Sequence, residues 1–194
     1  MSLIVLIGAQ AAGKMTVGKE LEKRLDAKLL FNHQTIDLFA NFLGYSLAAF
    51  ALSNQTRIEL FKAFVQNEAN NTTKSIIFTV LIDFDQAGDL AFLQEIAQLF
   101  TDAQQKVYFI ELVADIEERL KRNCHEDRLA AKPSKRALDF SRNELLSSFE
   151  NYRLESLPQE LTTLFPTIPS LKINNTHLSP DEVSQTIIAH FSLT

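Results

Sequence analysis

The chain has 194 residues, of which 46% are hydrophobic and 22% charged, a size and composition typical of one globular domain that spans residues 1–194. The formal net charge of −5 at pH 7 excludes the broad basic surface that general nucleic-acid binding needs. No apolar run reaches the ~20 residues that cross a membrane, and the lone Cys124 cannot form an internal disulfide. We therefore expect a cytoplasmic protein with neither a membrane nor a nucleic-acid partner.

A glycine-rich segment follows the first apolar run, residues 3–7, and precedes a helical pattern over residues 14–25. Its spacing is Gly-x-x-x-x-Gly-Lys, which in this context predicts a phosphate-binding loop. The glycines let successive backbone N–H groups point at phosphate oxygens, and the helix adds its positive N-terminal end. We predict that the nucleotide contacts are made by Gly8, Ala11, Ala12, Gly13, Lys14, Met15 and Thr16, with Lys14 also catalytic.

The position after Lys14 usually carries a Ser or Thr that reaches Mg²⁺, but here it is Met15, whose thioether is a poor ligand for a hard cation. The run from Gly13 to Leu21 resembles the Gly-Lys-Ser-Thr-Val-Gly-x-x-Leu of shikimate kinases, and Thr16 is placed like the threonine of adenylate kinases. The chain thus resembles the P-loop small-molecule and nucleotide kinases. That resemblance implies ATP and Mg²⁺ as cofactors and a small-molecule phosphate acceptor as partner.

Four further apolar runs read as strands, and helical patterns separate them. These strands are expected over residues 28–31, 75–82, 106–114 and 170–174. Alternation of strands and helices predicts an α/β fold in three layers, with a parallel sheet of five strands and helices on both faces. The resemblance to the P-loop NTPase fold of these kinases implies the strand order 2-3-1-4-5.

Polar residues follow the second expected strand. In an open parallel sheet the carboxyl ends of the strands lie at the ligand crevice, so Asn32, His33 and Asp37 are candidates for binding the acceptor. Thr35 is a plausible N-cap for a helix over residues 36–43. In the related kinases, the region between the second and third strands covers the acceptor.

The third and strongest strand signal ends in Asp83-Phe84-Asp85. A carboxylate just beyond a buried strand is typical of the residue that holds the Mg²⁺ of a bound nucleotide, so Asp83 is predicted to be catalytic and to contact the metal. Asp85 is the second candidate. The alternative is that either aspartate only caps a helix that begins near Gln86.

Basic residues concentrate before residue 137 although the chain as a whole is acidic. Seven of the 19 Lys and Arg side chains are Arg119, Lys121, Arg122, Arg128, Lys132, Lys135 and Arg136. They predict a short lid, over about residues 122–138, that closes on a polyphosphate; the alternative is a solvated basic helix face. Arg128-Leu129 resembles the lid sequence of shikimate kinases, which implies a catalytic Arg128 and ATP contacts from Arg122 and Arg136. The family also implies adenine contacts from residues 174–176.

The function predicted on this basis is an ATP-dependent kinase that acts on a small metabolite or nucleotide. The alternative is a nucleotide-binding ATPase or regulatory protein without transfer to a small molecule, which Met15 would favour. Two departures bear on the acceptor. The Asp-x-Asp of shikimate kinases is replaced at Asn32 and Gln34 or at His33 and Thr35, depending on the register, and their glycine triplet is replaced at Asp83–Asp85. The Asp-Gly-x-Pro-Arg signature of adenylate kinases is missing as well.

Overall fold

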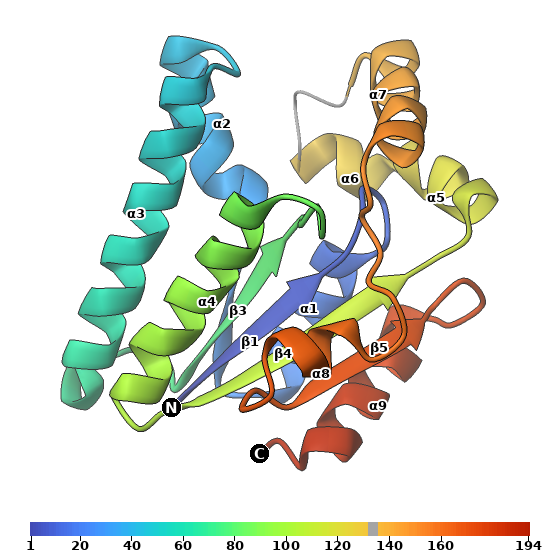
Figure 1. Cartoon of the computed structure of the whole chain (residues 1–194). Helices are drawn as coiled ribbons and strands as arrows, with labels where there is room; N and C mark the ends of the chain where they lie inside the picture. Colours follow the sequence, from blue (N-terminus) through green and yellow to red (C-terminus); the bar gives the residue numbers. More distant parts are fainter. Residues whose placement is uncertain (132–135) are drawn as a thin grey trace.

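The computed structural model describes residues 1–131 and 136–194, and for residues 127, 128 and 131 it describes the backbone only. One parallel sheet forms its centre (Figure 1). The strands run in the spatial order β2-β3-β1-β4-β5, which confirms the order implied by the resemblance. Their bounds are β1 Ser2–Ile7, β2 Ala27–Leu30, β3 Ser75–Val80, β4 Lys106–Val113 and β5 Ser170–Asn174.

Helices cover both faces of the sheet and confirm the three-layer α/β architecture (Figure 1). Side chains of α1 and α9 pack on one face, and side chains of α3, α4 and α8 pack on the other. The helices of the described part are α1 Lys14–Arg24, α2 Asn32–Leu43, α3 Leu47–Gln66, α4 Ala87–Asp102, α5 Ile116–Asn123, α6 Glu126–Ala131, α7 Leu138–Asn151, α8 Glu160–Leu164 and α9 Pro180–Phe191, with a 3-10 turn at Glu68–Asn70.

The alternation of side chains along the strands explains why the sheet is covered twice. In β1, Leu3 and Val5 belong to the apolar cluster under α3 and α4, whereas Ile4 and Leu6 belong to the cluster under α1 and α9. A strand that is buried on both faces reads as a continuous apolar run, which is the pattern from which it was predicted. The α3–α4 side is rich in phenylalanine, and the ring of Phe61 packs edge-on against Phe78 at 5.4 Å and Phe100 at 5.9 Å.

Several boundaries differ from the sequence prediction by one residue, and two differ by more. Helix α2 begins at Asn32 rather than at residue 36, so Thr35 is not its N-cap. Phe31 occupies the capping position, and its N–H donates to the side chain of Gln34 at 2.8 Å. The hydroxyl of Thr35 is buried instead, where it accepts hydrogen bonds from Ser53 and Arg57. Strand β3 ends at Val80, two residues earlier than predicted.

None of the helices in the part of the chain that the structure describes is long and apolar enough to cross a membrane.

Candidate functional site

The loop between β1 and α1 has the backbone that its glycines predict. Gly8 has a φ of 153°, Ala11 of 59° and Gly13 of 96°. A Cβ atom on Gly8 would lie 2.4 Å from the backbone oxygen of Leu112 in β4, so the loop passes the sheet at a distance that only glycine permits. Gly13 is the left-handed residue from which α1 begins. The loop therefore curls over the carboxyl end of β1, and the N-terminus of α1 points toward the centre of the curled loop.

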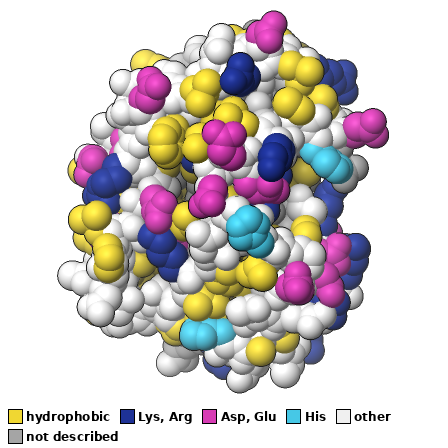
Figure 2. Space-filling model, turned by 90° about the vertical axis from the view of Figure 1, so that its right-hand side faces the viewer, with side chains coloured by type: hydrophobic (Ala, Val, Ile, Leu, Met, Phe, Trp, Pro, Cys, Tyr) yellow, Lys and Arg dark blue, Asp and Glu magenta, His cyan; other side chains and the backbone are white. Residues whose placement is uncertain are grey.

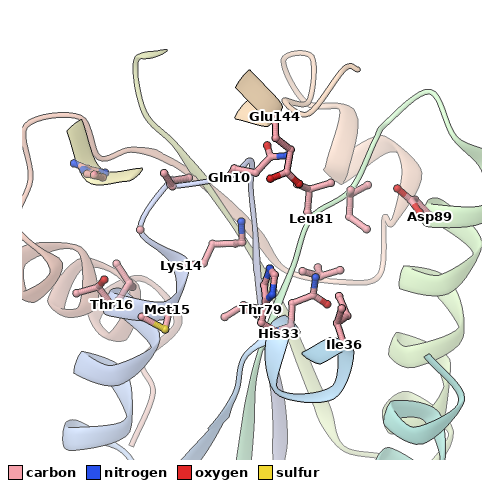
Figure 3. A pocket seen from close by; sticks show the side chains of 18 of the residues that line it. Gln10, Lys14, Met15, Thr16, His33, Ile36, Thr79, Leu81, Asp89 and Glu144 are labelled. Atoms are coloured by element: carbon pink, nitrogen blue, oxygen red, sulfur yellow. Dashed lines mark hydrogen bonds between the residues drawn. The ribbon is translucent and has the colours of Figure 1, made fainter. Parts of the chain in front are cut away.

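Lys14 lies across this loop. Its ammonium group donates hydrogen bonds to the carbonyl oxygens of Gly8 and Ala9, the latter at 2.7 Å. The side chain also lines a large cavity, and Figure 3 shows it pointing into that cavity. A flexible cation held beside converging backbone amides is the arrangement that phosphate binding requires.

The cavity has a volume of about 930 Å³, at the upper end of the range for ligand pockets. It runs along the carboxyl edge of the sheet. The phosphate loop lies at its middle (Figure 3). One end is lined by Glu118, Arg122, His125, Asn175, Leu178 and Pro180, and the other by Asn32, His33, Ile36, Tyr45, Phe50, Asn54, Arg57, Thr79, Leu81, Asp89, Phe92, Phe140 and Glu144.

At the first end, the segment after β5 is joined to the phosphate loop. The side-chain amide of Asn175, which is only 2% exposed, donates to the carbonyl of Ala12 at 2.9 Å. Arg122 donates to the backbone oxygens of Asn175 at 2.8 Å and Thr176 at 3.1 Å, and pairs with Glu118 at 2.9 Å. Arg122, which the sequence analysis assigned to ATP, therefore forms part of a fixed cavity wall.

The predicted basic lid divides into parts with different environments. Arg119 is 5% exposed, and its Nε donates to the carbonyl of Gln10 at 2.8 Å, so it supports the phosphate loop from behind. Arg136 is exposed and donates to the carbonyl of Leu129 at 3.2 Å. The side chain of Arg128 lies outside the described part of the chain, as do Lys132 and Lys135. On the face drawn in Figure 2, acidic and basic side chains are intermixed and not separated by sign.

At the other end, α2 brings the predicted acceptor residues to the cavity. Asn32 and His33 line it, whereas Asp37 is not one of the lining residues. Oδ1 of Asp37 lies 3.0 Å from Nδ1 of His33 and accepts a hydrogen bond from the hydroxyl of Tyr45 at 2.9 Å. Oδ1 of Asn32 is buried and has no hydrogen-bond donor among the described residues. A ligand hydroxyl or N–H group would satisfy that oxygen.

Arg57 is a cavity residue that the sequence analysis missed. It is 3% exposed and donates to Thr35, to Asn54 and to the carbonyl of Asn32, at 2.7–2.9 Å. Burial lowers the pKa of its guanidinium to about 10. Within residues 1–131 and 136–194, no carboxylate forms an ion pair with it. Its spacing in the sequence could have revealed it. Arg57 lies four residues after Ser53 and four before Phe61, and so on the same buried face of α3.

The carboxylates after β3 are arranged differently from the prediction. Asp83 is buried, accepts a hydrogen bond from the backbone N–H of Asp85 at 3.1 Å and is not one of the cavity-lining residues. Asp85 pairs instead with Arg153 at 2.8 Å. The carboxylate that lines the cavity is Asp89, in the first turn of α4, which accepts from the backbone N–H of Asp83 at 2.8 Å. Burial raises the pKa of Asp89, and its proximity to Asp83 raises it further.

A protein-bound metal site of the usual kind is not formed by the described residues, because none of them form a group of three or more His, Cys, Asp or Glu side chains suited to hold an ion. The metal role predicted for Asp83 stays a prediction. Of Asp83 and Asp89, only Asp89 lines the cavity. Its position follows from the packing of α4 against the end of β3, which the sequence alone does not show.

Solved structures with the same architecture include several kinases. A putative kinase from Chloroflexus aurantiacus is 19% identical, with 97% of each chain covered and a TM-score of 0.67. Shikimate kinase from Acinetobacter baumannii is 17% identical over 98% of this chain and 92% of that one, with a TM-score of 0.53. The Deinococcus radiodurans tunicamycin resistance protein is 17% identical over 100% and 98%, with a TM-score of 0.55. The chain has a P-loop kinase fold.

At these identities the likeness establishes the fold alone. No protein-family model matches the sequence, and no curated protein is similar enough in sequence to match it. Within the P-loop kinase fold, the chemistry therefore has to be argued from the cavity itself. That cavity joins a phosphate loop to a second compartment whose lining is part apolar and part polar.

Proposed function

We propose that the protein is an ATP-dependent phosphotransferase that transfers the γ-phosphoryl group of ATP to a hydroxyl of a small molecule. The observation that carries this proposal is the continuity of the cavity. The phosphate loop lies at its middle, with the residues after β5 lining one side and residues of α2, α3 and α4 lining the other. Such an arrangement places a donor phosphate and an acceptor in one enclosure, where positioning and charge neutralisation do most of the catalysis.

The nucleotide end suits ATP. Backbone amides between Gly8 and Gly13 and the ammonium of Lys14 would hold the phosphates, and Arg122 with Asn175 would flank the base. Mg²⁺ would arrive with ATP and neutralise phosphate charge. The hydroxyl of Thr16 and the carboxylate of Asp89 are hard oxygen donors among the lining residues of the cavity, whereas the thioether of Met15 is unsuited to this cation. Roles for Arg128 and Arg136 on the γ-phosphoryl group remain part of the proposal.

The acceptor end has a mixed lining. Its apolar and aromatic residues are Ile36, Tyr45, Phe50, Leu81, Phe92 and Phe140, and its polar residues are Asn32, His33, Asn54, Arg57, Thr79, Asp89 and Glu144. The unsatisfied oxygen of Asn32 calls for a donor, and the buried guanidinium of Arg57 favours an electron-rich group. We therefore propose a compact acceptor that has both apolar and polar groups, at least one of them a hydroxyl.

The test is a transfer assay with a panel of acceptors: nucleosides, nucleoside monophosphates, shikimate-like polyols, sugars and hydroxylated antibiotics. A kinase should release ADP much faster with one acceptor than without any. Lys14→Ala should abolish transfer and leave the fold intact. Lys19→Ala, on the exposed face of the same helix, is the matched control and should behave as wild type. Full turnover by the Lys14→Ala protein would refute the proposal.

A second candidate is a nucleotide-binding ATPase or regulator without transfer to a small molecule. The observation that favours it is Met15, which is buried at the position where a metal-binding hydroxyl is usual. The same assay separates the two, because this candidate predicts ATP binding with ADP release that no member of the panel stimulates.

A further inference from the structure

The first turn of α2 presents a histidine backed by a carboxylate. Nδ1 of His33 lies 3.0 Å from Oδ1 of Asp37, one turn later, and the hydroxyl of Tyr45 donates to that same oxygen at 2.9 Å. His33 and Tyr45 line the cavity and Asp37 does not. The carboxylate therefore stands behind the imidazole, and the imidazole faces the space where an acceptor would bind.

This contact selects the tautomer of the neutral imidazole. A carboxylate only accepts hydrogen bonds, so the proton of His33 is held on Nδ1, and Nε2 is left as the basic nitrogen. The second bond, from Tyr45, fixes the orientation of the Asp37 carboxylate and hence of the ring. A pair at this spacing on a helix could merely add a few tenths of a kcal/mol of helix stability. Two features distinguish this site from such a pair: the hydrogen bond from Tyr45 to Asp37, and the position of His33 at the cavity wall.

We infer that His33 is the general base of the phosphoryl transfer and that Asp37 and Tyr45 are its positioning residues. This inference rests on the proposed function. In the step, Nε2 takes the proton of the acceptor hydroxyl while the hydroxyl oxygen bonds to the γ-phosphorus of ATP. The bond from that phosphorus to the bridging oxygen breaks, ADP leaves with the electron pair, and the imidazolium later gives its proton to water.

The charged groups around the cavity bear on this role. Lys14 from α1 and Arg57 from α3 disfavour a positive imidazole, whereas Asp89 from α4 and Glu144 from α7 favour it, as does Asp37 behind it. Figure 3 shows Lys14, His33, Asp89 and Glu144 projecting from different walls of the same cavity. Asp89 is the rival base, but one of its oxygens already accepts the backbone N–H of Asp83.

The two candidate bases predict different pH profiles. An imidazole acts as a base only in its deprotonated form, so the rate should rise with pH over the range in which the imidazole loses its proton. The profile of a carboxylate base should rise at lower pH unless its own titration is shifted far upward. Substituting the residue that acts as the base should also remove the rise of the rate with pH. The two candidates can therefore be distinguished by which substitution removes that rise.

The experiment uses the full chain with ATP and Mg²⁺, and water as the probe acceptor, so that no acceptor has to be identified first. Slow ATP hydrolysis is followed at high protein concentration from about pH 5 to 9. His33→Asn should lower the rate at least ~10-fold and flatten the rise of the rate with pH. Binding of a fluorescent ATP analogue should stay within about twofold of wild type. Asp37→Asn and Tyr45→Phe should lower the rate by smaller factors, in that order.

The control is His190→Asn, the same chemical change on the exposed side of α9, where the ring packs on Phe191 outside the cavity. It should leave the rate and the profile unchanged. A His33→Asn protein that hydrolyses ATP at the wild-type rate with the wild-type profile overturns the inference. Loss of the profile in Asp89→Asn instead would assign the base to that carboxylate and also overturn it.

A second measurement is independent of turnover. Long-range ¹H–¹⁵N NMR of the histidine rings reports which nitrogen carries the proton. Neutral His33 should be protonated on Nδ1, and Asp37→Asn should weaken that preference. A neutral ring protonated on Nε2 overturns the inference whatever the rates are. Failure of the wild-type protein to bind ATP at all would refute the proposed function, and this inference with it.

Discussion

Replacing Gly8 by alanine tests whether the phosphate loop is held at its present distance from the sheet. The added Cβ would lie 2.4 Å from the backbone oxygen of Leu112, which is about 1 Å closer than the 3.4 Å at which ordinary contact begins. That oxygen belongs to β4, which pairs with β1 in the middle of the sheet. It cannot turn away as a flexible side chain would, so the loop or the strand has to shift.

The magnitude follows from two terms. Overpacking in a rigid core costs about 1–3 kcal/mol, and a positive φ at a residue with a Cβ costs a further ~1–2 kcal/mol. Gly8→Ala should therefore lower the free energy of unfolding by about 2–5 kcal/mol, out of a typical total of about 5–15 kcal/mol. For a chain of this length that corresponds to a fall in melting temperature of about 5–20 °C. ATP binding should be lost as well, because the amides of the loop move.

Two other glycines provide graded controls for thermal and urea unfolding. At Gly13 the φ is 96° and the added Cβ would lie 3.2 Å from Nδ2 of Asn175, so the cost should be smaller than at Gly8. At Gly88, in the first turn of α4, nothing lies within 4 Å, and alanine should be neutral or add up to ~1 kcal/mol. If Gly8→Ala unfolds no earlier than Gly88→Ala, the argument from the close approach of loop and sheet is wrong.

Three further predictions concern single side chains. Met15→Ser should retain activity and need less Mg²⁺ for half-maximal ATP hydrolysis, as measured by a Mg²⁺ titration; complete inactivation would mean that the buried thioether has a positive role. Asn175→Ala should cost about 1–3 kcal/mol in unfolding and weaken ATP binding, because the carbonyl of Ala12 loses its donor; an unchanged melting temperature would count against this. The ion pair with Arg153 holds the pKa of Glu160 below its usual value, so its contribution to stability is present above pH ~4.5 and is lost as the pH falls through the lowered pKa. Glu160→Gln should accordingly lower the free energy of unfolding at pH 7 and change it little near pH 2. An equal loss of stability at the two pH values would contradict this dependence on the charge of Glu160.

Much of the site was predictable because its residues are close in sequence. The phosphate loop is a local structure, and its spacing alone predicts the curled backbone and the placement of Lys14 over it. Asn32 and His33 were found because polar residues directly after a parallel strand lie at the ligand edge. Asp37 was expected to bind the acceptor by the same rule. In the helix that begins at Asn32, it lies one turn beyond His33 and behind it.

The cavity residues that were missed come from elements far apart in sequence. Arg57 lies in the buried stripe of α3, Tyr45 in the turn before α3, and Asp89 in the first turn of α4. Each appears ordinary in its own segment. Asp83 has the sequence position of a metal ligand, and in the turn after β3 one oxygen of its carboxylate accepts a local hydrogen bond. Its metal role stays a prediction.

The sequence by itself determined the fold class, the strands and the phosphate loop, because each depends on local periodicity or on the conformational freedom of two glycines. The tertiary structure alone decided which side chains share the cavity. The reason is geometric: α2, α3, α4 and α7 approach one another only after the sheet has brought their strands together, and side-chain direction at that edge depends on helix starts that shift by a few residues. A helix that began at residue 36 would have placed His33 outside α2; the one that begins at Asn32 places His33 one turn before Asp37, with Nδ1 of His33 3.0 Å from Oδ1 of Asp37.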